Sequence, residues 1–362
     1  MQERAYNQWA LSNKGTLAIA TGVGKSKIFI DACKYLIKAN PNATIALIVP
    51  TEKLRDENWK AEFIKWADIE LYNKIERFCY ASINKVAKVF DFIGADEVHN
   101  ITELNSKFFE LNRNSSIMGL TATPPEDEIK SNLLKIYAPV VFEYTLQEAV
   151  IDELVVPFNI KIIELPLDDK DKYIEVKTKS LQFKTTEKAY YDFLNKQINQ
   201  ARYAKNKQLE KFRILNRMRF LYNLKSKTEL AKKLISKLQD KRLLIFCGTI
   251  AQAEELCEHS YHSQKGDMDY LNFIHGEIKH LSCVRALNEG MNIPDLDAAL
   301  IVQGSSKKRE IIQRMGRAVR WREGHTAEIY IINSMGTQDV TWTQKALEGF
   351  APNIEYIHYK NV

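Results

Sequence analysis

Apolar runs alternate with helix-like polar patterns through the first 150 residues. Six runs read as strands: TLAIA, TIALIV, RFCYA, VFDFIGA, SIMGL and APVVFEY. Short continuous apolar runs are typical of strands buried on both faces, and their alternation with helical segments indicates βα units. The pattern predicts an α/β fold in which a parallel sheet is covered by helices on both faces.

Polar segments follow four of these runs at the point where each strand ends. They are ATGVGKS after the first run, PTEKL after the second, DEVHN after the fourth and TATPP after the fifth. Ligands of parallel sheets bind at the carboxyl ends of the strands. We therefore expect the four segments to meet at one site.

The first segment, LAIATGVGKS, has the composition of a phosphate-binding loop. Gly22 and Gly24 allow the backbone to fold around a small anion, and a helix is predicted to begin near Lys25. The free N–H groups of a helix start favour phosphate, Lys25 can reach the β- and γ-phosphates, and the Ser26 hydroxyl suits Mg²⁺. Ile19 stands where the full G-x-x-x-x-G-K-[ST] pattern has its first glycine.

The same alternation resumes in the second half of the chain. The chain is predicted to leave the first domain near residues 144–157, and FNIKIIELPL then reads as a strand. After a helix-rich stretch at 168–242 come RLLIFCG, LNFIHG, HLSCV, AALIVQG and AEIYIIN. We expect two tandem α/β domains, 1–152 and 153–362, the second including the 168–242 stretch.

One connection in the second domain is too short for the predicted strands. Only four residues, Glu277 to His280, connect Gly276 of LNFIHG to Leu281 of HLSCV, whereas a parallel crossover needs about a dozen. The strands are antiparallel, or one is not a strand, or a segment is missing from the chain; the sequence pattern favours the last explanation. The short stretch Ile83–Lys88 raises a weaker form of the same question.

Length and composition narrow the class of protein. A chain of 362 residues is long enough for two domains with separate cores. Its five cysteines are far apart and form no C-x-x-C pair, which argues against zinc and disulfides and for a reducing, intracellular setting. No apolar run approaches the roughly 18 residues that span a bilayer. The sequence predicts a soluble, cytoplasmic protein.

Positive charge is concentrated in one part of the chain. The net charge is +6, but 168–242 alone holds 21 Lys and Arg against 9 Asp and Glu. A concentrated basic region is the usual electrostatic footprint of a nucleic-acid partner, although Lys-rich helices are also simply well solvated. This distribution of charge favours a nucleic-acid partner over a set of merely well-solvated helices.

Together the segments resemble a known family. ATGVGKS, PTEKL, DEVH, TATP, ALNEGMNIPD and QRMGRAVR occur in the order of motifs I, Ia, II, III, V and VI of superfamily 2 helicases and translocases of the DExH type. The resemblance spans nearly the whole chain. It implies two RecA-like domains, with ATP and Mg²⁺ between them and nucleic acid across both. By this resemblance the nucleotide is bound by Thr21, Gly22, Val23, Gly24, Lys25 and Ser26.

DEVH supplies the carboxylates of the predicted site. Asp96 at the strand end suits Mg²⁺ on the phosphates together with Ser26, and Glu97 suits the orientation or deprotonation of the attacking water. The resemblance implies that His99 couples the nucleotide site to the second domain. It also implies that Thr121 and Thr123 bond the acidic motif.

QRMGRAVR is expected to act on the phosphates from the second domain. Helical spacing places Gln313, Arg317 and Arg320 on nearly one face, and arginine supplies fixed positive charge where the γ-phosphate develops negative charge. The resemblance implies two arginine fingers with Gln313 beside the γ-phosphate. In relatives the motif V glycine and acidic position approach the nucleotide, here Gly290 and Asn292, where aspartate is common.

Further positions come from weaker matches. Gln8 resembles the adenine-reading glutamine upstream of motif I, and Thr51 and Thr249 resemble positions along the nucleic-acid path. Arg217 lies in the basic stretch, where aromatic residues beside cations suit stacking on single-stranded bases. The spacing Phe212, Leu215, Arg219, Tyr222 is also that of an amphipathic helix, which favours most of these aromatics as core residues.

The expected function is ATP hydrolysis coupled to unwinding or remodelling of nucleic acid. DNA is favoured over RNA because DEVH with QRMGRAVRW resembles compact phage-type and restriction-motor DNA helicases. Two alternatives stay open. One is an RNA-dependent ATPase of the same fold, and the other is a non-unwinding DNA translocase that serves a nuclease or repair partner.

Overall fold

The structure, a computed structural model, forms two compact units. It describes the chain except for residues 68, 156, 178–181, 285–292, 294–295, 306–309, 313, 316–325 and 349–353. Met1–Val156 form the first unit, and the described residues from Pro157 onward form the second. Among the described residues, no helix combines the length and apolar character needed to cross a membrane.

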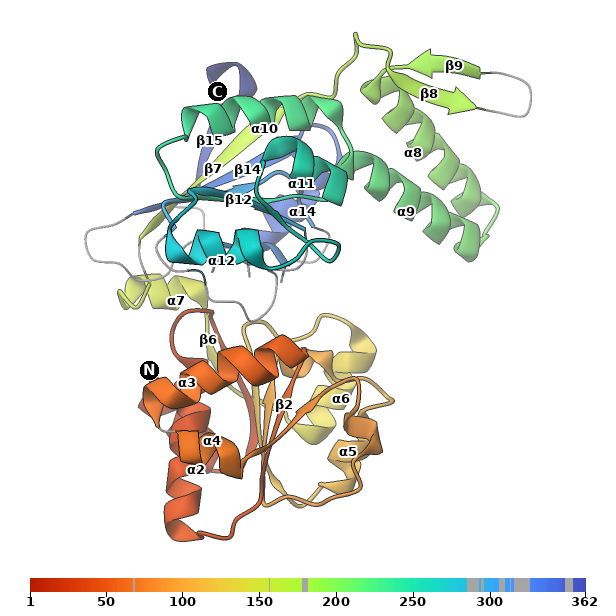
Figure 1. Ribbon diagram of the computed structural model, residues 1–362. Helices are drawn as coiled ribbons and strands as arrows, with labels where there is room; N and C mark the ends of the chain where they lie inside the picture. The colour runs from red at the N-terminus through yellow and green to blue at the C-terminus, as the bar shows by residue number, and fades with distance from the viewer. Residues whose placement is uncertain are drawn as a thin grey trace. The chain divides into compact units, whose positions relative to one another are not determined.

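The first unit is a six-stranded parallel sheet covered by helices on both faces (Figure 1). The strands run in the order β3-β2-β4-β5-β1-β6, and every pairing is parallel. The strands are β1 (Lys14–Ile19), β2 (Ile45–Val49), β3 (Glu76–Cys79), β4 (Phe92–Asp96), β5 (Ser116–Thr121) and β6 (Val140–Tyr144). The helices are α1 (Gln2–Ala10), α2 (Lys25–Ala39), α3 (Trp59–Trp66), α4 (Ile69–Lys74), α5 (Ser106–Leu111), α6 (Glu128–Tyr137) and α7 (Leu146–Ile151).

All six strands predicted from apolar runs are confirmed. The short stretch after RFCYA is compatible with a parallel sheet because β3 and β4 lie on either side of β2. The connection between them folds partly as a 3₁₀ turn, Ile83–Lys85. A missing segment is not required there.

Strand β4 shows how alternation along a buried strand holds both helical layers. Ile93 and Ala95 face the cluster formed with α5 and α6. Phe92 and Gly94 face the other way, where the Phe29 ring of α2 approaches Gly94 so closely that an added Cβ would lie 2.3 Å from it. Both faces are therefore buried, which explains why the strand reads as a continuous apolar run.

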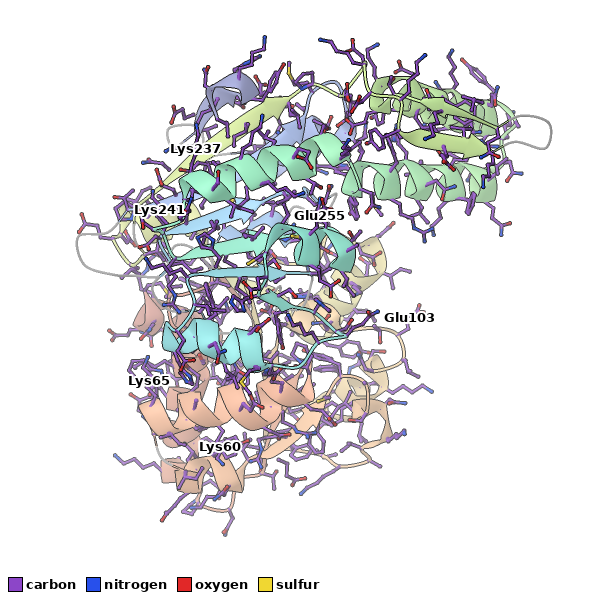
Figure 2. All side chains as sticks on the ribbon, turned by 45° about the horizontal axis from the view of Figure 1, so that its top comes forward. Lys60, Lys65, Glu103, Lys237, Lys241 and Glu255 are labelled. Carbon is purple, nitrogen blue, oxygen red and sulfur yellow. The ribbon has the colours of Figure 1, made fainter. Side chains whose placement is uncertain are left out.

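Helix α3 is amphipathic. Trp59 and Phe63, four residues apart, are buried, whereas Lys60 and Lys65 are exposed (Figure 2). The edge of the Trp59 ring packs against Phe29 with centroids 5.6 Å apart. This packing fixes the face of α3 that points toward the carboxyl ends of the strands.

The second unit contains a seven-stranded parallel sheet in the order β11-β12-β10-β13-β14-β7-β15. Its strands are β7 (Phe158–Leu165), β10 (Leu243–Phe246), β11 (Ser260–Tyr261), β12 (His280–Cys283), β13 (Ala298–Ile301), β14 (Ala327–Ser334) and β15 (Ile354–His358). The described helices that accompany it are α10 (Lys225–Lys237), α11 (Ile250–Leu256), α12 (Met268–His275) and α14 (Gln338–Ala346). With two parallel sheets, the predicted α/β fold class is confirmed.

The predicted strand LNFIHG is wrong. These residues end helix α12, whose buried Tyr270 and Phe273 are three residues apart, and Gly276 closes the helix with φ of 80°. Helix α12 leads to β12 through an ordinary helix-to-strand loop, so a missing segment is not required. Short apolar runs do not distinguish a strand from a buried helix face, which accounts for the error.

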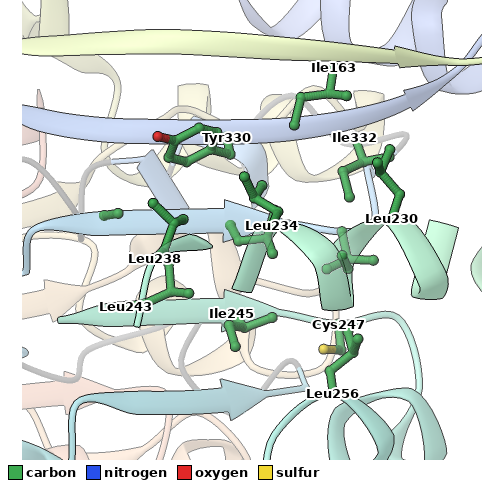
Figure 3. Packing of buried hydrophobic residues seen from close by; sticks show 14 of the residues in the cluster. Ile163, Leu230, Leu234, Leu238, Leu243, Ile245, Cys247, Leu256, Tyr330 and Ile332 are labelled. Carbon is green, nitrogen blue, oxygen red and sulfur yellow. The ribbon is translucent and has the colours of Figure 1, made fainter. Parts of the chain in front are cut away.

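The main core of the second unit lies between the sheet and helices α10 and α11 (Figure 3). Leu230, Leu234 and Leu238 recur every four residues and place one face of α10 and its C-cap on the strands. They contact inward side chains of β7, β10 and β14, among them Ile163, Ile245 and Ile332. Burial of each such side chain contributes about 1.5–3 kcal/mol.

A helical and strand insertion joins β7 to α10. It comprises the antiparallel pair β8 (Ile174–Lys177) and β9 (Gln182–Thr185) and helices α8 (Glu187–Tyr203) and α9 (Lys207–Tyr222). We call these four elements the arm (Figure 1). The predicted helix around Phe212 is confirmed, but Phe212 is 57% exposed rather than part of a core.

Candidate functional site

The loop between β1 and α2 has the backbone that its glycines predict. Gly22 and Gly24 adopt φ of 90° and 91°, which side chains other than glycine rarely tolerate. Gly24 is also a close approach, since an added Cβ would lie 2.2 Å from the amide nitrogen of Gln2. The loop ends at the start of a 15-residue helix, where free N–H groups and the dipole attract anions.

Lys25 and Ser26 begin this helix, and hydrogen bonds hold both side chains. Lys25 Nζ donates to the carbonyls of Ile19 and Ala20 at 2.8 and 3.3 Å. Ser26 Oγ donates to Glu62 Oε2 at 2.8 Å. The amine therefore lies above the end of β1, and the hydroxyl lies beside a carboxylate of α3.

The remaining loop residues differ in exposure. Thr21 is partly exposed and Val23 is buried with 7% of its surface exposed. The carbonyl of Val23 accepts a hydrogen bond from Gln2 Nε2 at 3.3 Å. Helix α1 thus supports the loop from the side.

Asp96 and Glu97 follow β4, two strands away from β1 in the sheet. Asp96 Oδ2 accepts from the Trp59 indole at 2.9 Å, and Asp96 Oδ1 accepts from the backbone N–H of Glu97 at 3.0 Å. These two bonds fix the orientation of the Asp96 carboxylate.

Glu97 has a strained backbone. Its φ of 47° and ψ of 52° place it in the left-handed region, and its side chain is 6% exposed. A non-glycine residue in this region costs on the order of 1–3 kcal/mol and persists where the surroundings enforce it, often at functional sites. The conformation turns the chain sharply after the strand and sets the direction of the carboxylate.

His99 links DEVH to TATP. His99 Nδ1 lies 3.0 Å from Thr121 Oγ1 and 3.4 Å from Glu97 Oε2, and the ring is fully buried. Thr121 Oγ1 also donates to the Thr123 carbonyl at 2.9 Å. The expected bond between TATP and the acidic motif runs through this imidazole.

These three segments follow three adjacent strands, since β4, β5 and β1 are neighbours in the sheet. Their donor set fits a nucleotide with Mg²⁺. Main-chain N–H groups and Lys25 suit phosphate oxygens, and the Ser26 hydroxyl with the Asp96 carboxylate suits a hard cation that prefers oxygen. Glu97, enforced in position and mostly buried, is suited to holding a water molecule.

The motif VI residues Gln313, Arg317 and Arg320, and the motif V residues Gly290 and Asn292, lie outside the described residues. Their described neighbour Arg314 is 5% exposed and donates to the carbonyl of Gln303 at 2.7 Å. Burial lowers the pKa of the Arg314 guanidinium, an effect that the carboxylate of Glu310 opposes.

A buried ion pair lies beside Arg314. Lys227 at the start of α10 bonds the Asp339 carboxylate at the start of α14, and both side chains are 0% exposed. Lys227 Nζ also lies 3.5 Å from Gln303 Oε1, and Gln303 follows β13. The network ties two helix starts to a strand end and, through the Gln303 carbonyl, to Arg314.

The predicted nucleic-acid residues fall in three places. Thr51 is exposed and caps the turn after β2, where its Oγ1 accepts from the N–H of Leu54 at 3.3 Å. Thr249 caps α11 and donates to Asn223 at the end of the arm at 3.3 Å. Arg217 joins α9 to α8 by donating to Asn195 at 2.6 Å.

Gln8 is exposed on α1 and lines a cavity of about 530 Å³ beside β6. The side chain of α1 that reaches the phosphate loop is Gln2, which the sequence reasoning did not single out. Glu62 and Trp59 were also missed, although they hold Ser26 and Asp96. Their only signal is a three-residue spacing on an amphipathic helix, a pattern that many helices share.

Two family models match the chain. The type III restriction enzyme, res subunit model matches residues 1–78, and the helicase conserved C-terminal domain model matches residues 226–322. A DNA 3'-5' translocase, XPB2 of Sulfurisphaera tokodaii, is 22% identical over 96% of this chain and 84% of its own length.

Two solved structures share the fold. A type ISP restriction-modification enzyme, LlaBIII, bound to DNA is 16% identical, covers 99% of this chain and has a TM-score of 0.62; the chain spans 31% of that enzyme. Dbp5 of S. cerevisiae, bound to RNA and ADP BeF3, is 12% identical with a TM-score of 0.64 over 99% of this chain and 90% of its own. At these identities the likeness shows two RecA-like units. The two family models, matched in order, and the curated relative, matched over 84% of its length, indicate a superfamily 2 helicase or translocase.

Proposed function

We propose that the protein hydrolyses ATP with Mg²⁺ and couples hydrolysis to movement along DNA, which it unwinds or remodels. One observation carries the proposal. Three adjacent parallel strands bring the phosphate loop, the DEVH carboxylates and the TATP hydroxyls to one edge of the first sheet, and His99 bonds the last two together.

The residues of this edge divide the chemistry among them. Bound Mg²⁺ supplies positive charge at the β- and γ-phosphates, and Ser26 with Asp96 would hold it. Lys25 binds the phosphates, and Glu97 orients the attacking water and accepts its proton. In the proposal Arg317 and Arg320 stabilise the charge that develops on the γ-phosphate, with Gln313 beside it, and Gly290, Asn292 and Gln8 contact the nucleotide.

DNA is the proposed partner. The curated relative is a DNA translocase, and a similar fold is found in a restriction-modification enzyme bound to DNA. The restriction enzyme also supports the second candidate, a translocase that moves along duplex without separating the strands. RNA remains the alternative partner because Dbp5 shares the fold. The free cysteines, most of them buried, support an intracellular setting.

The test is the ATPase rate with single-stranded DNA, duplex DNA, forked DNA and RNA of matched sequence. DNA is expected to stimulate turnover more than RNA, and Lys25→Ala is expected to lower it about a hundredfold or more by removing a phosphate-binding cation. Lys60→Ala, at an exposed lysine of α3, is the matched control and should leave turnover unchanged. Greater stimulation by RNA would reverse the proposed partner.

A strand-displacement assay on forked DNA separates the two DNA candidates. ATP-dependent displacement that is lost in Lys25→Ala supports a helicase. DNA-stimulated hydrolysis without displacement supports the non-unwinding translocase. Absence of nucleotide hydrolysis with every nucleic acid would contradict both.

A further inference from the structure

The arm contains a pocket that no helicase motif uses. A cavity of about 580 Å³ lies between strand β8 and helices α8 and α9. None of the residues that line it belongs to the motifs of the two sheets. The pocket is formed within the second unit alone.

Aromatic rings form one wall of this pocket. Tyr190 and Phe193 of α8 stack with centroids 6.1 Å apart and an interplanar angle of 28°. Phe220 of α9 meets Tyr190 edge-on at 5.0 Å. Phe193 is 41% exposed, so part of the ring surface faces solvent rather than a core. An open aromatic face beside polar groups suits stacking of a planar base.

Cations and amides complete the lining. Lys177 of β8 and Arg219 of α9 line the pocket, and neither forms an ion pair with any described residue. Gln197 and Asn216 add amides, and Glu175 is the one carboxylate among the lining residues. Residues 187–222, which span both helices, hold nine Lys and Arg against three Asp and Glu. The charge is complementary to a phosphate backbone.

Hydrogen bonds fix the arm to the sheet of its own unit. Glu187, 0% exposed, accepts from the N–H of Asp168 at 3.0 Å, from Tyr173 Oη at 2.6 Å and from Ser226 Oγ at 2.6 Å. At the C-terminal end of α9, Asn223 accepts a hydrogen bond from Thr249, which lies beside the carboxyl end of β10. A nucleotide held by the arm would therefore have a defined place relative to that edge.

We infer that the arm pocket binds one unpaired nucleotide of single-stranded DNA, with the base against Phe193 and the adjacent phosphates near Lys177 and Arg219. The inference rests on the proposed DNA partner. Base–aromatic stacking tolerates any sequence, so the pocket contributes grip without sequence preference. An acidic or apolar peptide is the competing occupant, and an oligothymidylate affinity that is the same in Phe193→Ala and wild type would favour it.

The test measures binding of a fluorescein-labelled oligothymidylate to the full chain by anisotropy across a salt series. Phe193→Ala is expected to weaken binding about tenfold through loss of stacking, whereas Phe193→Tyr preserves it. Arg219→Ala is expected to reduce the slope of log Kd against log salt by about one. Tyr203→Ala is the matched control, since Tyr203 lies at the end of α8, 88% exposed and outside the pocket.

The ATPase rate without DNA separates this inference from the proposed function. It should be the same in wild type, Phe193→Ala and Tyr203→Ala, which also shows that the variants fold. Equal DNA affinity for Phe193→Ala and Tyr203→Ala, with wild-type ATPase intact, would overturn the arm pocket while leaving the proposed function. If the wild-type chain shows no ATPase activity, the proposed function is wrong.

Discussion

The carboxyl edges of the two sheets carry polar networks of different character. In the first unit Asp96 ends strand β4, Glu97 and His99 follow it in a strained turn, and Lys25 lies above the end of β1, two strands away. In the second unit Lys227 and Asp339 form a fully buried ion pair that joins helix starts to each other. The first arrangement concentrates the proposed catalytic groups near a loop with positive φ angles. The second, in its described part, holds elements together.

The difference shows that polar groups at a strand end do not by themselves indicate chemistry. A buried pair in which each charge compensates the other becomes strongly destabilising when one partner is removed, so it holds its two elements in place. A carboxylate in a left-handed backbone costs stability, and it is retained where its direction matters. Both polar networks lie at carboxyl ends of strands. They differ because the first contains a strained backbone and the second contains a paired charge.

The largest effect is expected from a substitution at Glu97, on the carboxyl edge of the first sheet. Glu97→Gln keeps the shape of the side chain but removes the base, so we expect ATP turnover to fall about a hundredfold to ten-thousandfold with nucleotide affinity retained. Steady-state ATPase and nucleotide-binding measurements check both expectations. Glu103→Gln, at an exposed glutamate after the same motif, is the control (Figure 2). Retained turnover in Glu97→Gln would show that another group serves as the base.

The next largest effect is expected from a substitution in the buried Lys227–Asp339 pair of the second unit. Lys227→Met leaves Asp339 buried without its cation, and we expect a loss of about 3–5 kcal/mol in the free energy of unfolding. Replacement of both residues, Lys227→Met with Asp339→Leu, is expected to recover most of that loss. Urea titration of the full chain measures both. The exposed Lys232 on the same helix is the control, and Lys232→Met should leave the midpoint close to wild type. A small loss in Lys227→Met would mean that the pair is not what holds this edge.

The smallest effect separates strain from chemistry at Glu97. Glycine adopts the left-handed region without penalty, so Glu97→Gly is expected to be more stable than Glu97→Gln by about 1 kcal/mol, although both lack turnover. Thermal unfolding of the two variants side by side makes the comparison. If glycine is no more stable than glutamine, the backbone at Glu97 is not strained.

The sequence predicted the first edge well because its determinants are local. Paired glycines before Lys-Ser require positive φ, and Asp-Glu after an apolar run must lie at a strand end. The partners Gln2, Trp59 and Glu62 could not be predicted, since they reach the site through packing of α1 and α3. The roles of Arg317 and Arg320 stay predictions.

The second unit was predicted less completely for the same physical reason. The residues of α12 were taken for a strand because a short apolar run does not reveal its period. The β8–β9 pair has no buried residue to mark a core face: β8 alternates only between partly exposed and exposed positions, and β9 is exposed except at Thr185. Phe212 fits an amphipathic spacing, yet the described part of the arm leaves it 57% exposed. The spacing of apolar residues identifies the apolar face of a helix, but it does not tell which element packs against that face.

Glu187 has a consequence for how the second unit is built. Its carboxylate accepts from the N–H of Asp168, where the chain departs from the sheet domain, and from the N–H of Ser226, where it returns. The two ends of the arm are therefore neighbours, because one Glu187 carboxylate bonds both. The arm is an insertion that joins the domain at one place. Such a module can be exchanged or lengthened without altering strand order, which makes this junction the natural place for a motor of this kind to acquire a new specificity.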